Sequence, residues 1–271
     1  MKNKTKMYTK NHNAKILIVD IETAPTMAYV WRMWKENIRP QQIQEHGWIM
    51  LAAAKWYGEK HVMCERATKM GNDKNVVKWL WKLMDEADIV IAHNAKKFDV
   101  PSIYGRFVFH KLKPPKPFDI VDTLTEARRR FNFPHNSLEG LGEYLDIPIK
   151  KNPQGFKLWT DCLLSLDNSA WKRMATYCKG DVKALECVYE RLLPYMDRHP
   201  NMALFQTNHG GNKILCAICA GSKLQKRGTR KTKTQSYQTY SCKDCGSWTR
   251  DRFTCIKPKD RDRIGTSSVV T

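Results

Sequence analysis

The sequence lacks any apolar run long enough to cross a membrane. A spanning helix needs roughly 18 or more consecutive apolar residues, and the 271 residues contain no such run. The N-terminal segment is polar and basic with no apolar core, so it is not a secretory signal peptide. We therefore expect an intracellular protein of the cytoplasm or nucleoid, neither secreted nor attached to a membrane.

Acidic residues are scarce relative to basic ones. The chain has 27 Asp and Glu against 47 Lys and Arg, a net charge of +20. Residues 206–271 alone contain 14 basic and 4 acidic side chains, so their net charge is +10. Such an excess favours a polyanionic partner and predicts nucleic-acid binding. It predicts nothing about protein partners.

The nine cysteines do not suggest a disulfide framework. Their number is odd, and no secretion signal accompanies them. Four of them are scattered through apolar surroundings, where we expect free buried thiols: Cys64, Cys162, Cys178 and Cys187. Cys255, near the C-terminus, is also expected to be free.

The other four cysteines form two Cys-x-x-Cys pairs. Cys216 and Cys219 make the first pair, and Cys242 and Cys245 make the second, with 22 residues between the pairs. Two such pairs present four thiolates to one tetrahedral zinc ion. A redox-active pair is the alternative, but it does not explain the second pair. We predict one structural zinc.

An apolar segment that ends in carboxylates is the main feature of the first half of the chain. Residues 15–23 read KILIVDIET, which is typical of a buried strand. Asp20 and Glu22 are two residues apart, so they project from the same face, whereas Ile21 faces the core. Paired carboxylates are suitable ligands for Mg²⁺ or Mn²⁺. The alternative is a strand that ends in a solvated turn.

The remaining pattern predicts a mixed α/β sheet flanked by helices. We expect residues 27–46 to form a short helix and loop, and residues 146–167 to be irregular. Strands are predicted at 15–23, 48–57, 60–65, 88–93 and 118–121. Helices are predicted at 72–86, 100–110, 122–130, 138–145, from 170 to or past 180, and at 181–196.

Two further acids are placed where they can join the first pair. Asp99 closely follows the strand at 88–93, and Asp181 lies four residues after Tyr177, on the same helical face. Four carboxylates with two cations about 3.5–4 Å apart would make a phosphoryl-transfer site. Taken singly, Asp99 could be a helix cap and Asp181 a solvated residue. We interpret the other acids as caps or surface charges: Asp119, Asp122, Glu126 and Glu139.

Three motifs resemble those of the DEDD superfamily of 3′–5′ exonucleases, which has the ribonuclease H-like fold. They are Asp20-Ile-Glu22-Thr23, Asn94-Ala-Lys-Lys-Phe98-Asp99 and Tyr177-Cys-Lys-Gly-Asp181. The tyrosine four residues before the last Asp is similar to the DEDDy branch, which includes the proofreading domains of family B DNA polymerases.

The resemblance implies a role for each motif residue. Asp20, Glu22, Asp99 and Asp181 would bind two Mg²⁺ or Mn²⁺ ions, and Tyr177 would position the attacking water. Three more residues would contact the substrate end: Thr23, Asn94 and Phe98. His93, which stands near a position where glycine is common, is expected to be a strand-end residue and not a ligand.

The C-terminal cysteine pairs resemble the zinc ribbons found near transposase N-termini, although Ala217 replaces the usual proline. Between the pairs lie basic residues with no acid among them. We expect four of them to contact phosphates: Lys226, Arg227, Arg230 and Lys231. Tyr240 and Trp248 would either stack on bases or fill the small ribbon core.

These expectations combine into a domain scheme and a function. We expect a basic tail (1–14), a ribonuclease H-like exonuclease domain (15–200), a linker (201–212), a zinc ribbon (213–255) and a flexible basic end (256–271). The expected activity is metal-dependent 3′–5′ hydrolysis of single-stranded DNA. The alternatives are a 3′–5′ exoribonuclease and a catalytically inactive zinc-ribbon protein that binds nucleic acid.

Overall fold

A computed structural model describes residues 12–148, 154–164, 168–206 and 213–266. The chain divides into two compact units, which we describe separately. Residues 15–189 form one, and residues 1–14 and 190–271 form the other. Parts of the predicted N-terminal tail, linker and C-terminal end lie outside the described residues. The domain bounds given above remain a prediction.

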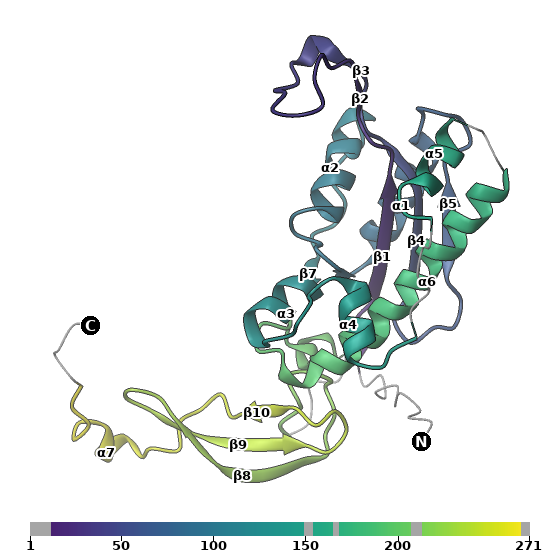
Figure 1. Ribbon diagram of the computed structural model, residues 1–271. Helices are drawn as coiled ribbons and strands as arrows, with labels where there is room; N and C mark the ends of the chain where they lie inside the picture. The colour runs from purple at the N-terminus through teal and green to yellow at the C-terminus, as the bar shows by residue number, and fades with distance from the viewer. Residues whose placement is uncertain (1–11, 149–153, 165–167, 207–212, 267–271) are drawn as a thin grey trace. The chain divides into compact units, whose positions relative to one another are not determined.

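The unit of residues 15–189 is built on a five-stranded sheet in the order β5-β4-β1-β6-β7 (Figure 1). β4 runs antiparallel to β1 and β5, whereas β6 runs parallel to β1 and β7. The strands are β1 (Ile16–Thr23), β4 (Ile49–Trp56), β5 (Met63–Arg66), β6 (Ile89–Ala92) and β7 (Asp119–Asp122). The predicted mixed sheet is confirmed.

β1 lies at the centre of this sheet, which explains its composition. Residues 16–19 are buried, because both edges of β1 are paired and its faces are covered. Across from Asp20 and Ile21, β4 contributes Ala53 and Ala52, which are fully buried. Asp20 and Glu22 therefore project from a central strand that is paired on both edges.

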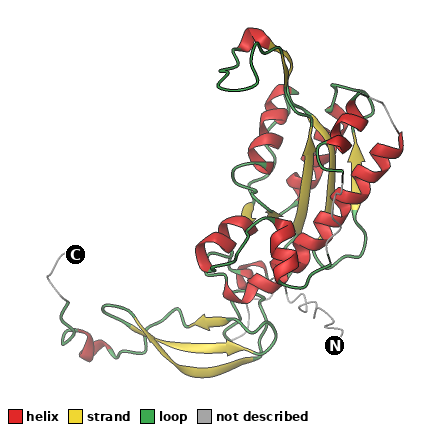
Figure 2. Ribbon diagram, in the orientation of Figure 1, coloured by secondary structure: helices red, strands yellow, loops and turns green. Residues whose placement is uncertain are grey.

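Helices flank the sheet, as Figure 2 shows in red. α1 contacts β4, β5 and α2, and α6 is tied to β4 by an ion pair between Lys55 and Glu186. The helices of this unit are α1 (Lys74–Glu86), α2 (Asp99–Phe109), α3 (Thr123–Arg130), α4 (Leu138–Tyr144), α5 (Lys157–Leu163) and α6 (Asn168–Leu192). Among the described residues, none of the helices is both long enough and apolar enough to cross a membrane.

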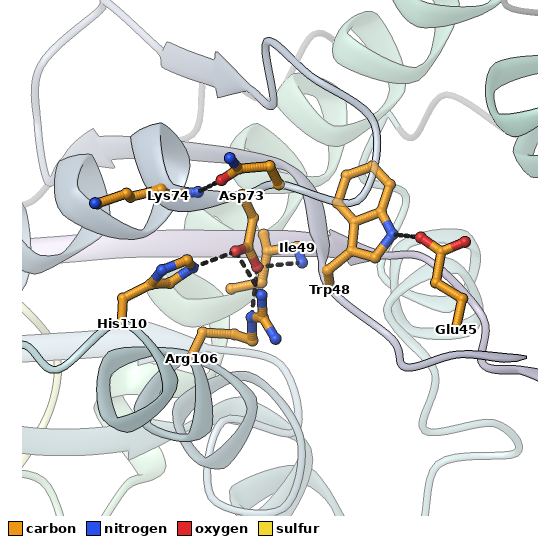
Figure 3. A network of polar contacts seen from close by, with 8 residues as sticks. Glu45, Trp48, Ile49, Asp73, Lys74, Arg106 and His110 are labelled. Carbon is orange, nitrogen blue, oxygen red and sulfur yellow. Dashed lines mark hydrogen bonds and ion pairs between the residues drawn. The ribbon is translucent and has the colours of Figure 1, made fainter. Parts of the chain in front are cut away.

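The buried carboxylate of Asp73 connects three of these elements (Figure 3). It precedes α1 and accepts a hydrogen bond from the backbone N–H of Ile49 at 2.9 Å. Arg106 of α2 reaches it through Nε and Nη2 at 2.6 and 2.7 Å, and His110 through Nε2 at 2.6 Å. Burial alone would raise the pKa of Asp73, but these hydrogen bonds outweigh burial and lower it. The ionised carboxylate thus joins β4, α1 and α2.

Three expectations about this unit differ from the structure. Residues 27–46 do not form a short α-helix. They form a hairpin of β2 (Met27–Ala28), the 3-10 turn η1 (Pro40–Gln42) and β3 (Ile43–Glu45). The segment 146–167 is not entirely irregular, because it contains α5, whose Leu158 and Cys162 are buried. The two helices expected before and after residue 180 are one continuous helix, α6.

The second unit contains a three-stranded antiparallel sheet in the order β10-β9-β8. β9 is central and pairs with both neighbours. The elements of this unit are η2 (Leu193–Tyr195), η3 (Met202–Phe205), β8 (Leu224–Lys231), β9 (Ser236–Cys242), β10 (Trp248–Arg250) and α7 (Pro258–Arg261). The small sheet and the cysteine pairs beside it fit the predicted ribbon.

Candidate active site and zinc site

Asp20 and Glu22 stand side by side near the C-terminal end of β1. Both belong to the regular part of the strand, and a β-bulge follows between Glu22 and Thr23. Ile21, which lies between them in sequence, is 3% exposed on the opposite face. The alternation of the strand therefore brings the two carboxylates together, and the solvated turn considered above does not occur.

Asp99 reaches the same place from the first turn of α2. It is 2% exposed, and the backbone N–H of Ile21 in β1 donates a hydrogen bond to its carboxylate. The other oxygen, Oδ2, is buried and has no hydrogen-bond partner. A buried carboxylate oxygen left without a partner is costly, so this atom is suited to bind a cation.

α6 contributes the last members of the cluster. Tyr177 and Asp181 are one helical turn apart, and the tyrosine hydroxyl donates a hydrogen bond to Asp181. Between them, the Cys178 thiol donates to Asp20 Oδ2 at 3.2 Å. The ligand atoms of Asp20, Glu22 and Cys178 lie within 4.8 Å of one another. The helix thus packs directly against the acids of β1.

The pKa values of the acids show that their charges interact. Burial, and then repulsion by Glu22, Asp99 and Asp181, raises the pKa of Asp20 well above its usual range. Burial, then Asp181 and Asp99, raises the pKa of Glu22 to about 8. Mainly through burial, the pKa of Asp99 rises to about 7 and that of Asp181 to about 6. Four carboxyl groups that repel one another can all ionise near neutral pH only beside a cation.

The donor set fits hard divalent metal ions. The four acids offer only oxygen ligands, which Mg²⁺ and Mn²⁺ prefer. Cys178 is a soft donor, but burial, followed by the charges of Asp20 and Glu22, raises the pKa of its thiol well above the usual range. The protonated thiol therefore acts as a hydrogen-bond donor to Asp20, and the acids remain the candidate ligands.

Comparison with known proteins assigns a family. The model of the RNase_H superfamily matches residues 41–193, more than half of the chain. The chain belongs to the RNase H superfamily. The matched residues include Asp99, Tyr177 and Asp181, whereas Asp20 and Glu22 precede them. No curated protein matches the sequence.

Among solved structures, the RNase H-like chain is similar to a family B DNA polymerase from the hyperthermophilic archaeon Pyrobaculum calidifontis. The sequence identity is 15% and the TM-score 0.52, so the similarity concerns the fold alone. The match covers 71% of this chain but only 25% of the polymerase chain. The chain thus corresponds to about a quarter of that protein.

Three positions near the acid cluster make contacts that the sequence did not predict. Asp122 was expected to be a cap or a surface charge, and it does accept hydrogen bonds from Leu124 and Thr125 at the start of α3. It also accepts 3.1 Å hydrogen bonds from the backbone N–H groups of Asn94 and Lys96. The turn that leads to Asp99 is therefore held by a carboxylate from the neighbouring strand, a link that local sequence does not reveal.

Cys178, whose thiol donates to Asp20, and Glu139 are the other two positions. The charge of Glu139, in the first turn of α4, raises the pKa of Asp181 after the larger effect of burial. Glu139 also lines a hollow of about 350 Å³ with Tyr177, Phe156 and Trp159. Glu139 is exposed, as expected of a surface charge, although its charge also acts on Asp181. Glu126, by contrast, is not a surface charge, because it is buried and paired with Arg129.

Two of the predicted substrate contacts adjoin cluster acids in the chain, since Thr23 follows Glu22 and Phe98 precedes Asp99. Thr23 is the last residue of β1. Asn94 has a φ of +76°, in the left-handed region that asparagine tolerates, and Phe98 is 41% exposed. His93 makes 2.9 Å contacts with Thr123 Oγ1 and the Asn136 carbonyl, so its ring is engaged within the fold.

In the second unit, the four ribbon cysteines converge as their spacing predicts. Their sulfur atoms form one buried cluster within 4.8 Å of one another. Cys216 and Cys245 are 3.6 Å apart, and Cys219 and Cys242 are 3.7 Å apart. Gly246 has a φ of +76°, which favours glycine in the turn of the second pair. Four convergent thiols fit a tetrahedral zinc ion.

The basic residues of the ribbon are all exposed. β8 presents Lys226, Arg227, Arg230 and Lys231 to solvent. Tyr240 is buried, as the core-filling alternative predicts, whereas Trp248 is 62% exposed and does not fill the core. The Arg250 guanidinium lies 4.1 Å from the centre of the Tyr237 ring. The ribbon therefore presents both cations and accessible aromatic rings to solvent.

Proposed function

We propose that the protein is a metal-dependent 3′–5′ exonuclease that degrades single-stranded DNA. The observation that carries the proposal is the meeting of four carboxylates from β1, α2 and α6, whose pKa values are all raised. Membership of the RNase H superfamily supports a nuclease. The direction and the substrate rest on the three motifs.

The proposed chemistry is in-line hydrolysis of a phosphodiester. Two Mg²⁺ or Mn²⁺ ions, when bound, would activate a water and stabilise the leaving oxygen. Asp20, Glu22, Asp99 and Asp181 would hold these ions. Tyr177 would orient the water, because burial, then the charge of Asp181, raises its pKa and keeps the phenol neutral. Thr23, Asn94 and Phe98 would contact the terminal nucleotide.

The ribbon would supply affinity for the same strand. A zinc ion bound by the four cysteines would hold the two turns together. The phosphates of the strand would then be contacted by four cations of β8: Lys226, Arg227, Arg230 and Lys231. We propose that residues 15–200 and 213–255 act as the nuclease domain and the zinc ribbon of this enzyme.

The test is digestion of end-labelled single-stranded and duplex DNA and RNA with Mg²⁺, Mn²⁺ or a chelator. A 5′ label that is retained on progressively shorter products indicates 3′–5′ action. Asp20→Asn is expected to abolish turnover but keep nucleic-acid affinity. Asp119→Asn is the matched control, because Asp119 is an exposed acid on a strand of the same sheet. Degradation confined to RNA would indicate an exoribonuclease. If neither DNA nor RNA is degraded in the presence of metal, the protein is a nucleic-acid binding protein and not a nuclease.

A further inference from the structure

The hairpin of residues 27–46 leaves the sheet after β1 and returns to it at β4 (Figure 1). None of its residues is buried. Its large apolar side chains are among the most exposed in the described chain: Trp31 is 92% exposed, Met33 87%, Trp34 80% and Tyr29 72%. Apolar side chains gathered in this way usually mark a binding surface.

Polar contacts, not a core, give the hairpin its shape. The backbone N–H of Tyr29 donates to the Gln42 carbonyl at 2.9 Å, and Gln42 Nε2 donates to the Tyr29 carbonyl at 2.9 Å. The backbone N–H of Arg39 donates to Gln42 Oε1 at 2.8 Å. Gln42 thus provides hydrogen-bond partners for the backbone groups of Tyr29 and Arg39. The exposed aromatic rings are not needed to hold the hairpin together and can contact another molecule.

The base of the hairpin is fixed to the sheet. The backbone N–H of Ala24 donates to the Trp48 carbonyl at 2.8 Å, and a Cβ on Gly47 would stand 2.9 Å from the Ala24 carbonyl oxygen, so only glycine fits there. The buried Trp48 indole donates to Glu45 at 2.9 Å, and the next residue, Ile49, bonds Asp73 (Figure 3). The hairpin thus projects from an anchored base.

We propose that this hairpin is a stacking platform for an unpaired nucleic-acid strand. Each exposed tryptophan is followed by a cation, Arg32 after Trp31 and Lys35 after Trp34, and all four side chains are exposed. Aromatic faces stack on unpaired bases while adjacent cations meet the phosphates. A protein partner would not need this pairing of ring and charge.

The hairpin is close in sequence to the acids of β1. Trp31 follows Glu22 by nine residues, which limits their separation to about 32 Å at ~3.6 Å per residue. About ten nucleotides at ~3.4 Å each would cover that distance. The identification of the strand as the substrate rests on the proposed function, whereas stacking itself requires no hydrolysis.

The test measures binding of the full chain, prepared with zinc and assayed without Mg²⁺, Mn²⁺ or chelator, because a chelator would also remove zinc from the ribbon. Fluorescently labelled oligothymidylate and oligouridylate of about 20 nucleotides are the probes. We expect Trp31→Ala/Trp34→Ala to weaken binding at least about tenfold, since stacking is lost at two positions. Trp31→Phe/Trp34→Phe should retain most of the affinity. A blunt duplex should bind all variants equally, because its bases are already stacked.

Val108→Ala is the control for loss of exposed apolar surface, because Val108 is 77% exposed on α2; it should bind as the unmodified chain does. Unchanged affinity of the alanine pair would overturn the proposal, and so would an equal loss on single strands and duplex. If the alanine pair changed only the oligomeric size of the free protein, the hairpin would be a protein interface, which also overturns it. Since neither Mg²⁺ nor Mn²⁺ is supplied for turnover, the result does not depend on nuclease activity.

Discussion

The charge of single side chains decides what the acid cluster can do. Asp20 is half-buried among three other carboxyl groups, and its pKa is raised first by burial and then by its neighbours. The Cys178 thiol gives Asp20 one compensating hydrogen bond. One hydrogen bond does not offset the repulsion of several charges, so a bound cation would change the energetics of the whole cluster.

Replacing Tyr177 by Phe tests the role of its hydroxyl. The ring remains, but the hydrogen bond to Asp181 and the group that would hold the water are lost. We expect kcat to fall roughly 10- to 100-fold, as a mispositioned water would cause, with little change in nucleic-acid affinity. Single-turnover digestion and anisotropy measure the two quantities. Activity equal to that of the unmodified protein would exclude a positioning role.

The raised pKa of Glu22 predicts how the stability of the metal-free protein depends on pH. The group binds its proton more tightly when folded, because its pKa rises from 4.5 to about 8. Its contribution to stability is therefore present below about pH 4.5 and is lost as the pH rises through 8. In chelator, we expect the Tm to fall over this range.

Saturating Mn²⁺ should reverse this trend, because a cation favours the ionised carboxylates and binds only the folded state. The measurement is thermal unfolding at several pH values with chelator or Mn²⁺. Asp20→Asn should flatten the curve in chelator, and Asp119→Asn should not. Identical pH profiles with and without Mn²⁺ would count against a metal site at these acids.

At the scale of elements, the position of α2 determines where Asp99 lies. α2 is connected to β4 and the start of α1 through the carboxylate of Asp73, which is completely buried. The turn before α2 is held by Asp122 from β7. Asp73 and Asp122, which lie outside the cluster, thus determine the position of Asp99 within it. Each does so by accepting hydrogen bonds from segments distant in sequence.

Asp73→Asn should destabilise the protein strongly. Arg106 and His110 would lose a charged partner in a buried setting, which typically costs about 3–5 kcal/mol. Urea unfolding followed by circular dichroism measures the change. Asp119→Asn, at an exposed position, should change the free energy of unfolding by less than about 0.5 kcal/mol. Equal effects of the two substitutions would show that the buried network does not support the fold.

For the whole molecule, the net charge of +20 predicts salt-dependent association with nucleic acid. The logarithm of affinity for a single strand should fall linearly with the logarithm of salt concentration. Replacing Lys226 and Arg230 by Gln should reduce the slope by about 1.4, since each phosphate contact contributes ~0.7. The measurement is fluorescence anisotropy over a salt series, with the protein prepared with zinc and with no Mg²⁺, Mn²⁺ or chelator added, because a chelator would also remove zinc from the ribbon.

Lys78→Gln/Lys82→Gln is the matched control. Both residues are exposed cations on α1, and the double variant removes the same charge as the ribbon variant. We expect it to leave the slope unchanged. If both variants reduced the slope equally, net charge and not the basic strand β8 would explain binding, and the proposed role of the ribbon would be wrong.

The sequence by itself determined features whose signals are local. The apolar run before Asp20 predicts β1, the four-residue spacing of Tyr177 and Asp181 places them on one helical face, and the cysteine spacing predicts the sulfur cluster. These patterns follow from backbone periodicity and from metal geometry, which act over a few residues.

Only the tertiary structure decided the partners of side chains that act across long separations. Asp122 holds the turn at Asn94, Glu139 influences Asp181, and Asp73 binds Arg106. The tertiary structure likewise decided that Trp31 and Trp34 are exposed. An acid can cap a helix, pair with a cation or remain solvated, and an aromatic ring can be buried or exposed. Packing between distant segments selects among these states, because it sets which groups lose their water and what replaces it.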